Sequence, residues 1–260
     1  MDSLTQKDVD SVWSEVWEKN NDVNTRSVFS HRLFIEGYTF FHPYIPKQTE
    51  SILEVGTGSG RYAVAFARDF PEARVVATDI VQSSLSLVEE LGRVVGVKNL
   101  SVHHEDAEAL SYEDNSFDVV FSDAVLQHVP NEEKMVSEMA RVAKPGGMVI
   151  ISSVNARSLH FVVRFIRERI FRQRYSYGIE RMYTKTRLQE LAKRAGLTVE
   201  TISGFYPAYG IYRLKNYWRG YAAIGRALNR ITRFVDRYTH SYMSKHFGFE
   251  LALIAKKPLH

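Results

Sequence analysis

The chain has 260 residues, of which 45% are hydrophobic and 25% charged, and its formal net charge is +4. This length and composition are typical of a water-soluble globular protein with one large domain, or with a core domain that carries insertions. The chain has no cysteine, which excludes disulfides, thiolate metal sites and a cysteine nucleophile. An acidic, polar start and the lack of any apolar run of about 18 to 20 residues predict a cytoplasmic protein without a signal peptide or membrane span.

The first fifty residues contain two predicted helices and no strand. Residues 8–19 place valines and tryptophans on one helical face, and residues 26–41 form the second predicted helix. We expect residues 1–48 to form an N-terminal helical cap on the domain that follows.

From residue 51 on, short apolar runs alternate with helical segments. The strands are predicted at 51–55, 74–79, 100–104, 118–122, 148–154, 198–202 and 249–255. The helices between them are predicted at 62–70, 83–95, 132–143 and 186–195, the third ending before a Lys-Pro-Gly-Gly breaker. This alternation predicts an α/β fold, with a seven-stranded, mostly parallel sheet and helices on both of its faces.

The most informative short segment is ILEVGTGSG at residues 52–60, where Glu54 ends an apolar run and Gly56, Gly58 and Gly60 follow. The turn comes after a strand, at the edge of the sheet where open α/β folds bind ligands. A dinucleotide fingerprint requires Gly or Ala at the position that Arg61 occupies, and a P-loop requires a Lys-Ser/Thr pair that is missing here. The glycines therefore indicate a different ligand that the backbone approaches closely.

Four more segments follow in order: VVATDI, HHEDAE, FDVVFSDAVLQHV and ARVAKPGGMVII. Together with ILEVGTGSG, they resemble the motifs of the class I S-adenosylmethionine-dependent methyltransferases, over residues 50–202 and the last strand. The resemblance implies a Rossmann-like sheet, S-adenosyl-L-methionine as the cofactor, and methyl transfer as the activity. It also implies a methyltransferase domain over 49–260, with helical insertions near 155–182 and 204–247.

The resemblance assigns cofactor contacts residue by residue. Asp79 matches the position that binds the ribose, where one carboxylate can accept both hydroxyls. Asp106 matches the acidic position beside the adenine amino group. The remaining implied cofactor contacts are Glu54, Gly56, Thr57, Gly58, Gly60, Ile80, Ala107 and Ser122.

Two residues after the fourth strand are the candidates for work on the acceptor. His128 titrates near neutral pH and is the best candidate for a general base, although a packing role is the simpler alternative. Asp123 has two alternative roles, orienting an amine acceptor or the ammonium of the cofactor. The adjacent pair His103-His104 points to opposite faces of a strand and has no third ligand in view, so we predict no metal site.

The positive charge is concentrated in two segments. Residues 155–182 carry a net charge of +5 and residues 211–240 one of +6, which leaves −7 for the rest of the chain. Both segments combine an apolar helical stripe with arginines, as a lid packed on the domain or a helix on an anionic membrane would. Phosphate-bearing substrates or RNA also suit such a surface, but no RNA-binding module is recognisable, so nucleic acid is less favoured.

The sequence therefore predicts methyl transfer from S-adenosyl-L-methionine to a small-molecule or lipid acceptor, with peripheral contact to an anionic membrane as one use of the basic helices. RNA methylation is one alternative. A non-catalytic scaffold or sensor that binds S-adenosylmethionine is the other.

Overall fold

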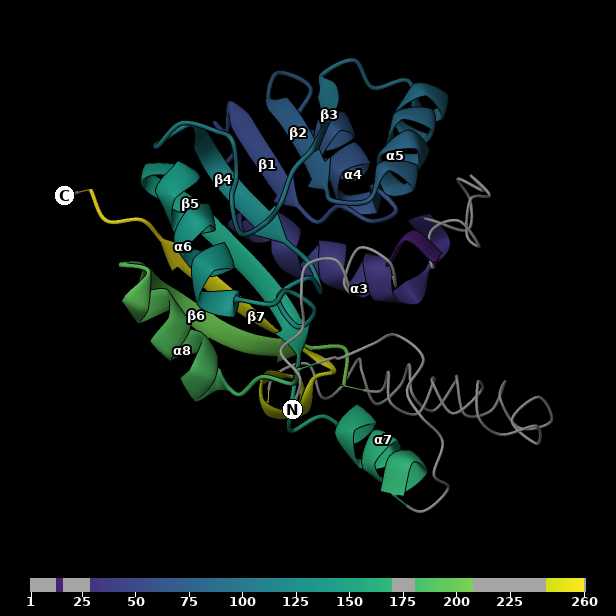
Figure 1. Ribbon diagram of the computed structural model, residues 1–260, viewed down its shortest axis with the longest axis vertical. Helices are drawn as coiled ribbons and strands as arrows, with labels where there is room; N and C mark the ends of the chain where they lie inside the picture. The colour runs from purple at the N-terminus through teal and green to yellow at the C-terminus, as the bar shows by residue number, and fades with distance from the viewer. Residues whose placement is uncertain (1–12, 16–28, 170–180, 208–241, 260) are drawn as a thin grey trace.

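The computed structural model describes residues 13–15, 29–169, 181–207 and 242–259 (Figure 1). Of the helix predicted over 8–19, residues 13–15 are described, and they are helical. The basic segment 211–240 and its apolar stripe lie outside the described residues.

Seven strands form one sheet in the order β3-β2-β1-β4-β5-β7-β6. They are β1 (Ser51–Val55), β2 (Arg74–Asp79), β3 (Leu100–His104), β4 (Phe117–Ser122), β5 (Ala143–Val154), β6 (Thr198–Phe205) and β7 (Glu250–Lys256). Only β7 runs against its neighbours, because it pairs antiparallel with both β5 and β6 while β1 to β5 pair in parallel. The predicted fold class, a seven-stranded and mostly parallel Rossmann-like sheet, is confirmed.

Helices cover both faces of the sheet (Figure 1). One hydrophobic cluster joins the sheet to α3 (Arg32–Phe41), α4 (Arg61–Asp69) and α5 (Gln82–Val95). A second cluster on the other face joins it to α6 (Glu132–Val142) and α8 (Lys185–Arg194). Leu85, Val88 and Leu91 show why such helices form, since residues three apart share one helical face and all three are buried.

Two predicted strand boundaries are wrong by three residues or more, because tertiary contacts extend the strands, and one predicted helix is interrupted. The strand predicted from residue 148 begins at Ala143, because Phe117 pairs with Ala143 and Gly146 N donates to the carbonyl of Lys257 at 2.8 Å. The strand predicted to end at residue 202 continues to Phe205, which pairs with Glu250. The helix predicted over 26–41 is interrupted at His31, which is extended: residues 29–30 are helical, and α3 begins at Arg32.

Three further elements complete the described chain. The short 3₁₀ helix η1 (His42–Tyr44) follows α3, while α7 (Leu159–Arg169) and α11 (Met243–Phe247) fall within the two predicted insertions. Figure 1 shows α7 projecting away from the sheet. Within the described ranges, no helix combines the length and the apolar character that crossing a bilayer requires.

Candidate functional site

A cavity opens at the carboxyl ends of β1, β2 and β4, the edge at which open α/β sheets bind ligands. Motifs that are far apart in the sequence meet there. Of the twelve predicted site residues, those that line the cavity are Glu54, Gly56, Thr57, Gly58, Asp79, Ile80, Asp106, Ala107, Asp123 and His128. The parallel register of the strands brings these residues together, because it places every strand end at the same edge.

Gly60 and Ser122 do not line the cavity, and we assign them to its framework rather than to ligand contact. Gly60 has φ 73° and caps α4, and a Cβ there would lie 2.7 Å from Val88 Cγ2. Its lack of a side chain therefore lets α4 pack closely on α5. Ser122 is fully buried, and its hydroxyl donates to the carbonyl of Val55 at 2.8 Å, which ties β4 to β1.

Gly56 is the glycine that the cavity itself requires. Its φ is 72°, and a Cβ there would lie 2.4 Å from Val125 Cγ2. A side chain at this position would thus combine a strained backbone with a steric clash. The loop leaves β1 as a bare backbone that faces the cavity.

Glu54 holds this loop from beneath. Its Oε2 accepts hydrogen bonds from Thr57 Oγ1 at 2.7 Å and from the backbone N–H of Ala63 at 2.8 Å. Burial raises the pKa of the Glu54 carboxyl to about 8, against the opposing effect of these two donors. The side chain therefore connects the glycine loop to the first turn of α4.

Asp79 ends β2 with its carboxylate at the cavity wall. Its Oδ2 accepts from the backbone N–H of Gly58 at 2.8 Å, and its Oδ1 accepts from that of Val81 at 3.0 Å. Burial raises the pKa of Asp79, and the two backbone donors act in the opposite direction. Each carboxylate oxygen has a second lone pair, so Asp79 can still accept from a ligand hydroxyl.

Asp106 and Glu105 both line the cavity after β3, but they differ in how far their carboxylate oxygens are already hydrogen-bonded within the protein. The Glu105 carboxylate accepts from both the backbone N–H and the hydroxyl of Ser111. Asp106 accepts at Oδ1 from the N–H of Glu108 at 2.8 Å, and its Oδ2 accepts no hydrogen bond from the described residues. The free oxygen makes Asp106 the better acceptor for a ligand amino group.

Asp123 belongs to a carboxyl pair, with the buried Glu250, that the sequence did not indicate. The Ser152 hydroxyl donates to Asp123 Oδ1 at 2.6 Å and lies 3.1 Å from Glu250 Oε2, so it bridges the end of β4 to the start of β7. Burial, followed by the negative charge of Asp123, raises the pKa of Glu250 well above its usual value. Glu250 lies behind Asp123, which is the member of the pair that lines the cavity.

His128 also lines the cavity and contacts an aromatic residue from the N-terminal segment. The rings of Trp13 and His128 meet edge to face, with centroids 4.7 Å apart, and both residues line the cavity. Between Asp123 and His128, Ala124 has φ 58°, a left-handed conformation that is rare for a residue with a side chain. The chain therefore turns sharply where it leaves β4, which places both candidates on the same cavity.

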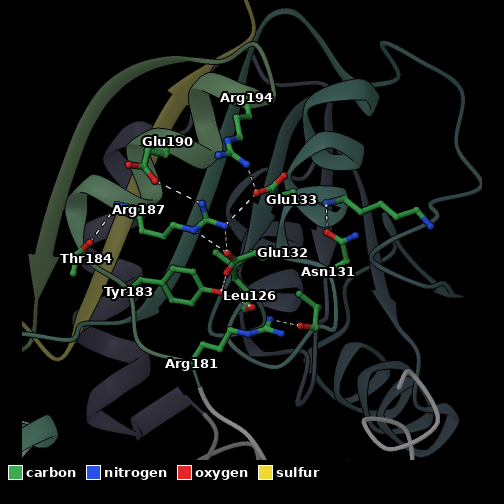
Figure 2. Close-up of polar contacts among 12 residues, drawn as sticks. Leu126, Asn131, Glu132, Glu133, Arg181, Tyr183, Thr184, Arg187, Glu190 and Arg194 are labelled. Carbon is green, nitrogen blue, oxygen red and sulfur yellow. Dashed lines mark hydrogen bonds and ion pairs between the residues drawn. The ribbon is translucent and has the colours of Figure 1, made fainter. Parts of the chain in front are cut away.

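Hydrogen bonds from the segment 181–184 hold the loop that carries His128 in place (Figure 2). Arg181 donates to the carbonyls of Val129 and Pro130, and its own backbone N–H donates to the carbonyl of Gln127. The Tyr183 hydroxyl lies 3.1 Å from the carbonyl of Leu126. These contacts leave the loop little freedom beside the cavity.

Sequence reasoning missed several residues at the site, and their signals differ. Arg61 and Tyr62 directly follow the glycine loop, so their lining positions could have been inferred from the motif itself. Trp13 and Glu250 lie outside every cofactor motif and reach the site only through tertiary packing. No group of three or more potential metal ligands occurs among the described residues.

Comparison with known proteins relates this geometry to a family. Residues 53–151 match the family described as "Methyltransferase domain". The chain is 33% identical over 122 residues to a ubiquinone biosynthesis O-methyltransferase of Paracidovorax citrulli, a stretch that covers 46% of this chain and 50% of that protein. It is 37% identical over 114 residues to phosphoethanolamine N-methyltransferase 2 of Caenorhabditis elegans, covering 43% of this chain and 25% of that one. The chain thus spans half or less of these curated relatives.

Solved structures resemble the chain over more of its length. The phosphoethanolamine N-methyltransferase 2 of Haemonchus contortus in complex with S-adenosyl-L-methionine superposes with a TM-score of 0.61 at 20% identity. The superposition covers 95% of this chain and 60% of that one. The fold is therefore that of a class I methyltransferase. With the family match, residues 53–151 are identified as a methyltransferase domain.

Proposed function

We propose that the protein transfers a methyl group from S-adenosyl-L-methionine to a small-molecule or lipid acceptor. The observation that carries this proposal is the convergence of the glycine loop, Asp79 and Asp106 with Asp123 and His128 on one cavity. The first three are suited to hold a nucleoside, and the last two to handle an acceptor beside it.

The residues present fit the cofactor. Asp79 offers carboxylate oxygens to the two ribose hydroxyls, and the free Oδ2 of Asp106 offers an acceptor to the adenine amino group. Gly56 and Gly58 expose backbone, and Thr57, Ile80 and Ala107 complete the wall. Glu54 keeps the loop in place through Thr57 and Ala63 rather than through a free carboxylate.

When it is bound, S-adenosyl-L-methionine supplies an activated methyl group on a sulfonium sulfur. The enzyme's own contribution is then proximity and orientation, which are worth up to about 7 to 11 kcal/mol. His128 is placed to take a proton from an acceptor hydroxyl or amine, and Asp123 to orient a cationic group. Ser152, which bridges Asp123 and Glu250, holds Asp123 in a fixed direction for that task.

The acceptor class is proposed from the relatives together with the cavity. The relatives' names refer to ubiquinone biosynthesis and to phosphoethanolamine, which are small or lipid-related acceptors. The cavity combines apolar walls, such as Val125 and Val129, with the aromatic ring of Trp13. Such a wall suits a partly apolar acceptor better than a nucleic acid strand.

We also propose that residues 1–48 cap the cavity, and that residues 49–260 form the catalytic domain with insertions near 155–182 and 204–247. Trp13 supports the cap, because it reaches the cavity from outside the family-matched segment. The position of α7 beyond the end of β5 supports the first insertion.

The first test measures binding of the product S-adenosylhomocysteine by calorimetry, and then transfer of radiolabelled methyl groups. Asp79→Ala should weaken binding by about ten- to a hundredfold, because it removes charge-assisted hydrogen bonds to the ribose. Glu72→Ala, which removes an exposed carboxylate away from the cavity, is the matched control and should bind as the wild type does.

The transfer assay offers a quinol, phosphoethanolamine, a lipid extract and RNA as acceptors. Label in a small molecule or lipid supports the proposal. Label in RNA alone would assign the protein to RNA methylation. Tight binding without transfer to any acceptor would indicate a non-catalytic scaffold or sensor, and an unchanged affinity in Asp79→Ala would remove Asp79 from the ribose site.

A further inference from the structure

The end of the molecule that carries α7 has a surface that the cavity does not use, here named the basic-aromatic face. Its basic residues come from three separate elements, and its apolar residues are exposed. The basic members are Arg157, Lys185 and Lys245, and the apolar members are Leu159, Phe161, Phe165, Tyr242 and Phe247.

Hydrogen bonds hold the three elements together at this end. The side-chain amide of Asn155, just before α7, donates to the carbonyls of His246 at 3.1 Å and Gly248 at 2.8 Å. The backbone N–H of Ala156 donates to the carbonyl of Tyr183, just before α8, at 2.9 Å. The starts of α7 and α8 and the end of α11 therefore meet, which makes the face a fixed feature of the fold.

Lys185 lies close enough to the other two cations for their charges to act on it. The pKa of the Lys185 ammonium is lowered, first by partial burial and then by the positive charges of Lys245 and Arg157. Throughout the described ranges, no carboxylate forms an ion pair with any of these three residues. Like charges gathered without counter-charges disfavour the free protein slightly and favour an anionic surface.

The apolar members are concentrated at this end rather than scattered. Five of the eight large hydrophobic side chains that are exposed in the described chain belong to this face. Phe161 and Phe165 lie one helical turn apart on α7, and Phe165 and Tyr242 are 55% and 68% exposed. Exposed apolar residues that cluster in this way mark an interaction surface.

We propose that the basic-aromatic face docks the protein on an anionic lipid bilayer. Aromatic and leucine side chains on a helix enter the interface of a bilayer, while basic residues around them bind acidic headgroups. A nucleic acid or an acidic protein would use the cations but would leave the phenylalanines of α7 exposed to water. The chemistry of the whole face therefore favours a lipid surface.

The docking inference deepens the proposed function and rests on it, because a bilayer is where a lipid acceptor would be met. The face also adjoins the segment that supports the cavity. Tyr183 and Arg181, which hold the loop carrying His128, come directly before Lys185 in the chain. The segment 181–185 therefore belongs both to the docking face, through Lys185, and to the support of the cavity wall, through Arg181 and Tyr183.

The experiment is flotation with vesicles of phosphatidylcholine alone or mixed with phosphatidylglycerol. The wild type should float only with the anionic vesicles, and less so at high salt. The triple variant Arg157→Gln, Lys185→Gln, Lys245→Gln should lose about fivefold in partitioning per residue, or roughly a hundredfold in all. A second variant, Phe161→Ser with Phe165→Ser, should also bind less while keeping its charge.

The matched control neutralises three exposed lysines on other parts of the surface, Lys47→Gln, Lys98→Gln and Lys134→Gln, and should float as the wild type does. S-adenosylhomocysteine binding, measured on every variant, reports on folding and on the proposed function separately. Docking is overturned if the wild type does not float with either vesicle, if zwitterionic vesicles bind equally well, or if the control triple loses as much as the face triple. Salt-sensitive RNA binding without flotation would also overturn it.

Discussion

Two buried side chains at the cavity, Glu54 and Asp79, show how a carboxyl group takes different roles according to its hydrogen-bond partners. Asp79 accepts two backbone N–H groups at the cavity wall and keeps lone pairs for a ligand. Glu54 lies deeper, and its Oε2 accepts from Thr57 and Ala63, which anchors the loop. Glu54, beside the glycines, thus organises the loop, while Asp79, at the end of the next strand, can still accept hydrogen bonds from a ligand.

The raised pKa of Glu54 predicts a specific dependence of stability on pH. Its pKa rises from 4.5 to about 8 on folding. Between these values the unfolded chain has lost the proton and the folded chain keeps it, so stability falls as the pH rises, by at most about 1.4 kcal/mol per pH unit. Below the lower value and above the upper one, Glu54 contributes no slope.

Glu54→Gln should remove this dependence, because an amide does not titrate and keeps an oxygen to accept from Thr57 and Ala63. Urea unfolding of the wild type and the variant, measured from pH 4 to pH 9, gives the test. Their difference in unfolding free energy should change only across the window above, in favour of the variant as the pH rises. A difference that stays constant with pH would mean that Glu54 titrates alike in both states.

At the scale of elements, helices α6 and α8 are joined by ion pairs of unequal burial (Figure 2). Glu132 accepts from Arg187 Nε at 2.8 Å and also contacts the Tyr183 hydroxyl, and its side chain is 16% exposed. Glu133 accepts from Arg194 at 2.5 Å, but the two side chains are 44% and 61% exposed. Both glutamates lie in the first turn of α6, where the helix dipole favours negative charge equally.

Double-mutant cycles should separate the two pairs. The Glu132–Arg187 coupling is expected at about 1 to 2 kcal/mol, because burial reduces its screening. The Glu133–Arg194 coupling is expected below about 0.5 kcal/mol, as for most exposed pairs. Because Glu132 and Glu133 lie in the same turn of α6, the second cycle controls for the effect of the helix dipole. Equal couplings in the two cycles would contradict burial as the deciding factor.

Sequence periodicity predicted the elements well where local and tertiary preferences agree. The strands at 51–55, 74–79 and 100–104 have the predicted limits, because each is a short segment bounded by turns. The extension of β5 back to Ala143 was missed, because Pro and Gly argue locally against a strand while pairing with Phe117 and Lys257 overrides them. Turn chemistry is local, whereas strand pairing depends on partners elsewhere in the chain, of which Lys257 lies more than a hundred residues beyond Gly146.

The candidate site divides in the same way. Positions within the motifs, such as Asp79 and Asp106, could be placed at the cavity because strand ends in a parallel sheet share an edge. Glu250 and Trp13 could not, because nothing in their local sequence states which strand or wall they meet. Glu250 reaches Ser152 and Asp123 only because β7 pairs with β5 and brings Glu250 opposite Val154.

At the scale of the whole molecule, the sheet is completed by the strand that comes last in the sequence. β7 lies between β5 and β6 and pairs with both over its full length. Leu251, Leu253 and Ile254 are essentially fully buried, and they contribute to the hydrophobic clusters on both faces of the sheet. The same strand carries Glu250, so the core and the carboxyl pair at the cavity are completed together.

Removal of residues 249–260 should therefore abolish cooperative folding and not merely lower stability. Burying a leucine or isoleucine side chain contributes about 1.5 to 3 kcal/mol, so these three side chains alone approach the 5 to 15 kcal/mol by which domains are stable. The deletion also leaves β5 and β6 with unpaired edges, which promote aggregation. Removal of residues 258–260, where Pro258 and Leu259 are exposed, is the matched control and should leave the melting transition in place. The test is a thermal melt followed by circular dichroism, with S-adenosylhomocysteine binding measured on the same samples. A truncated chain that melts cooperatively and binds the ligand would show that the sheet forms without β7.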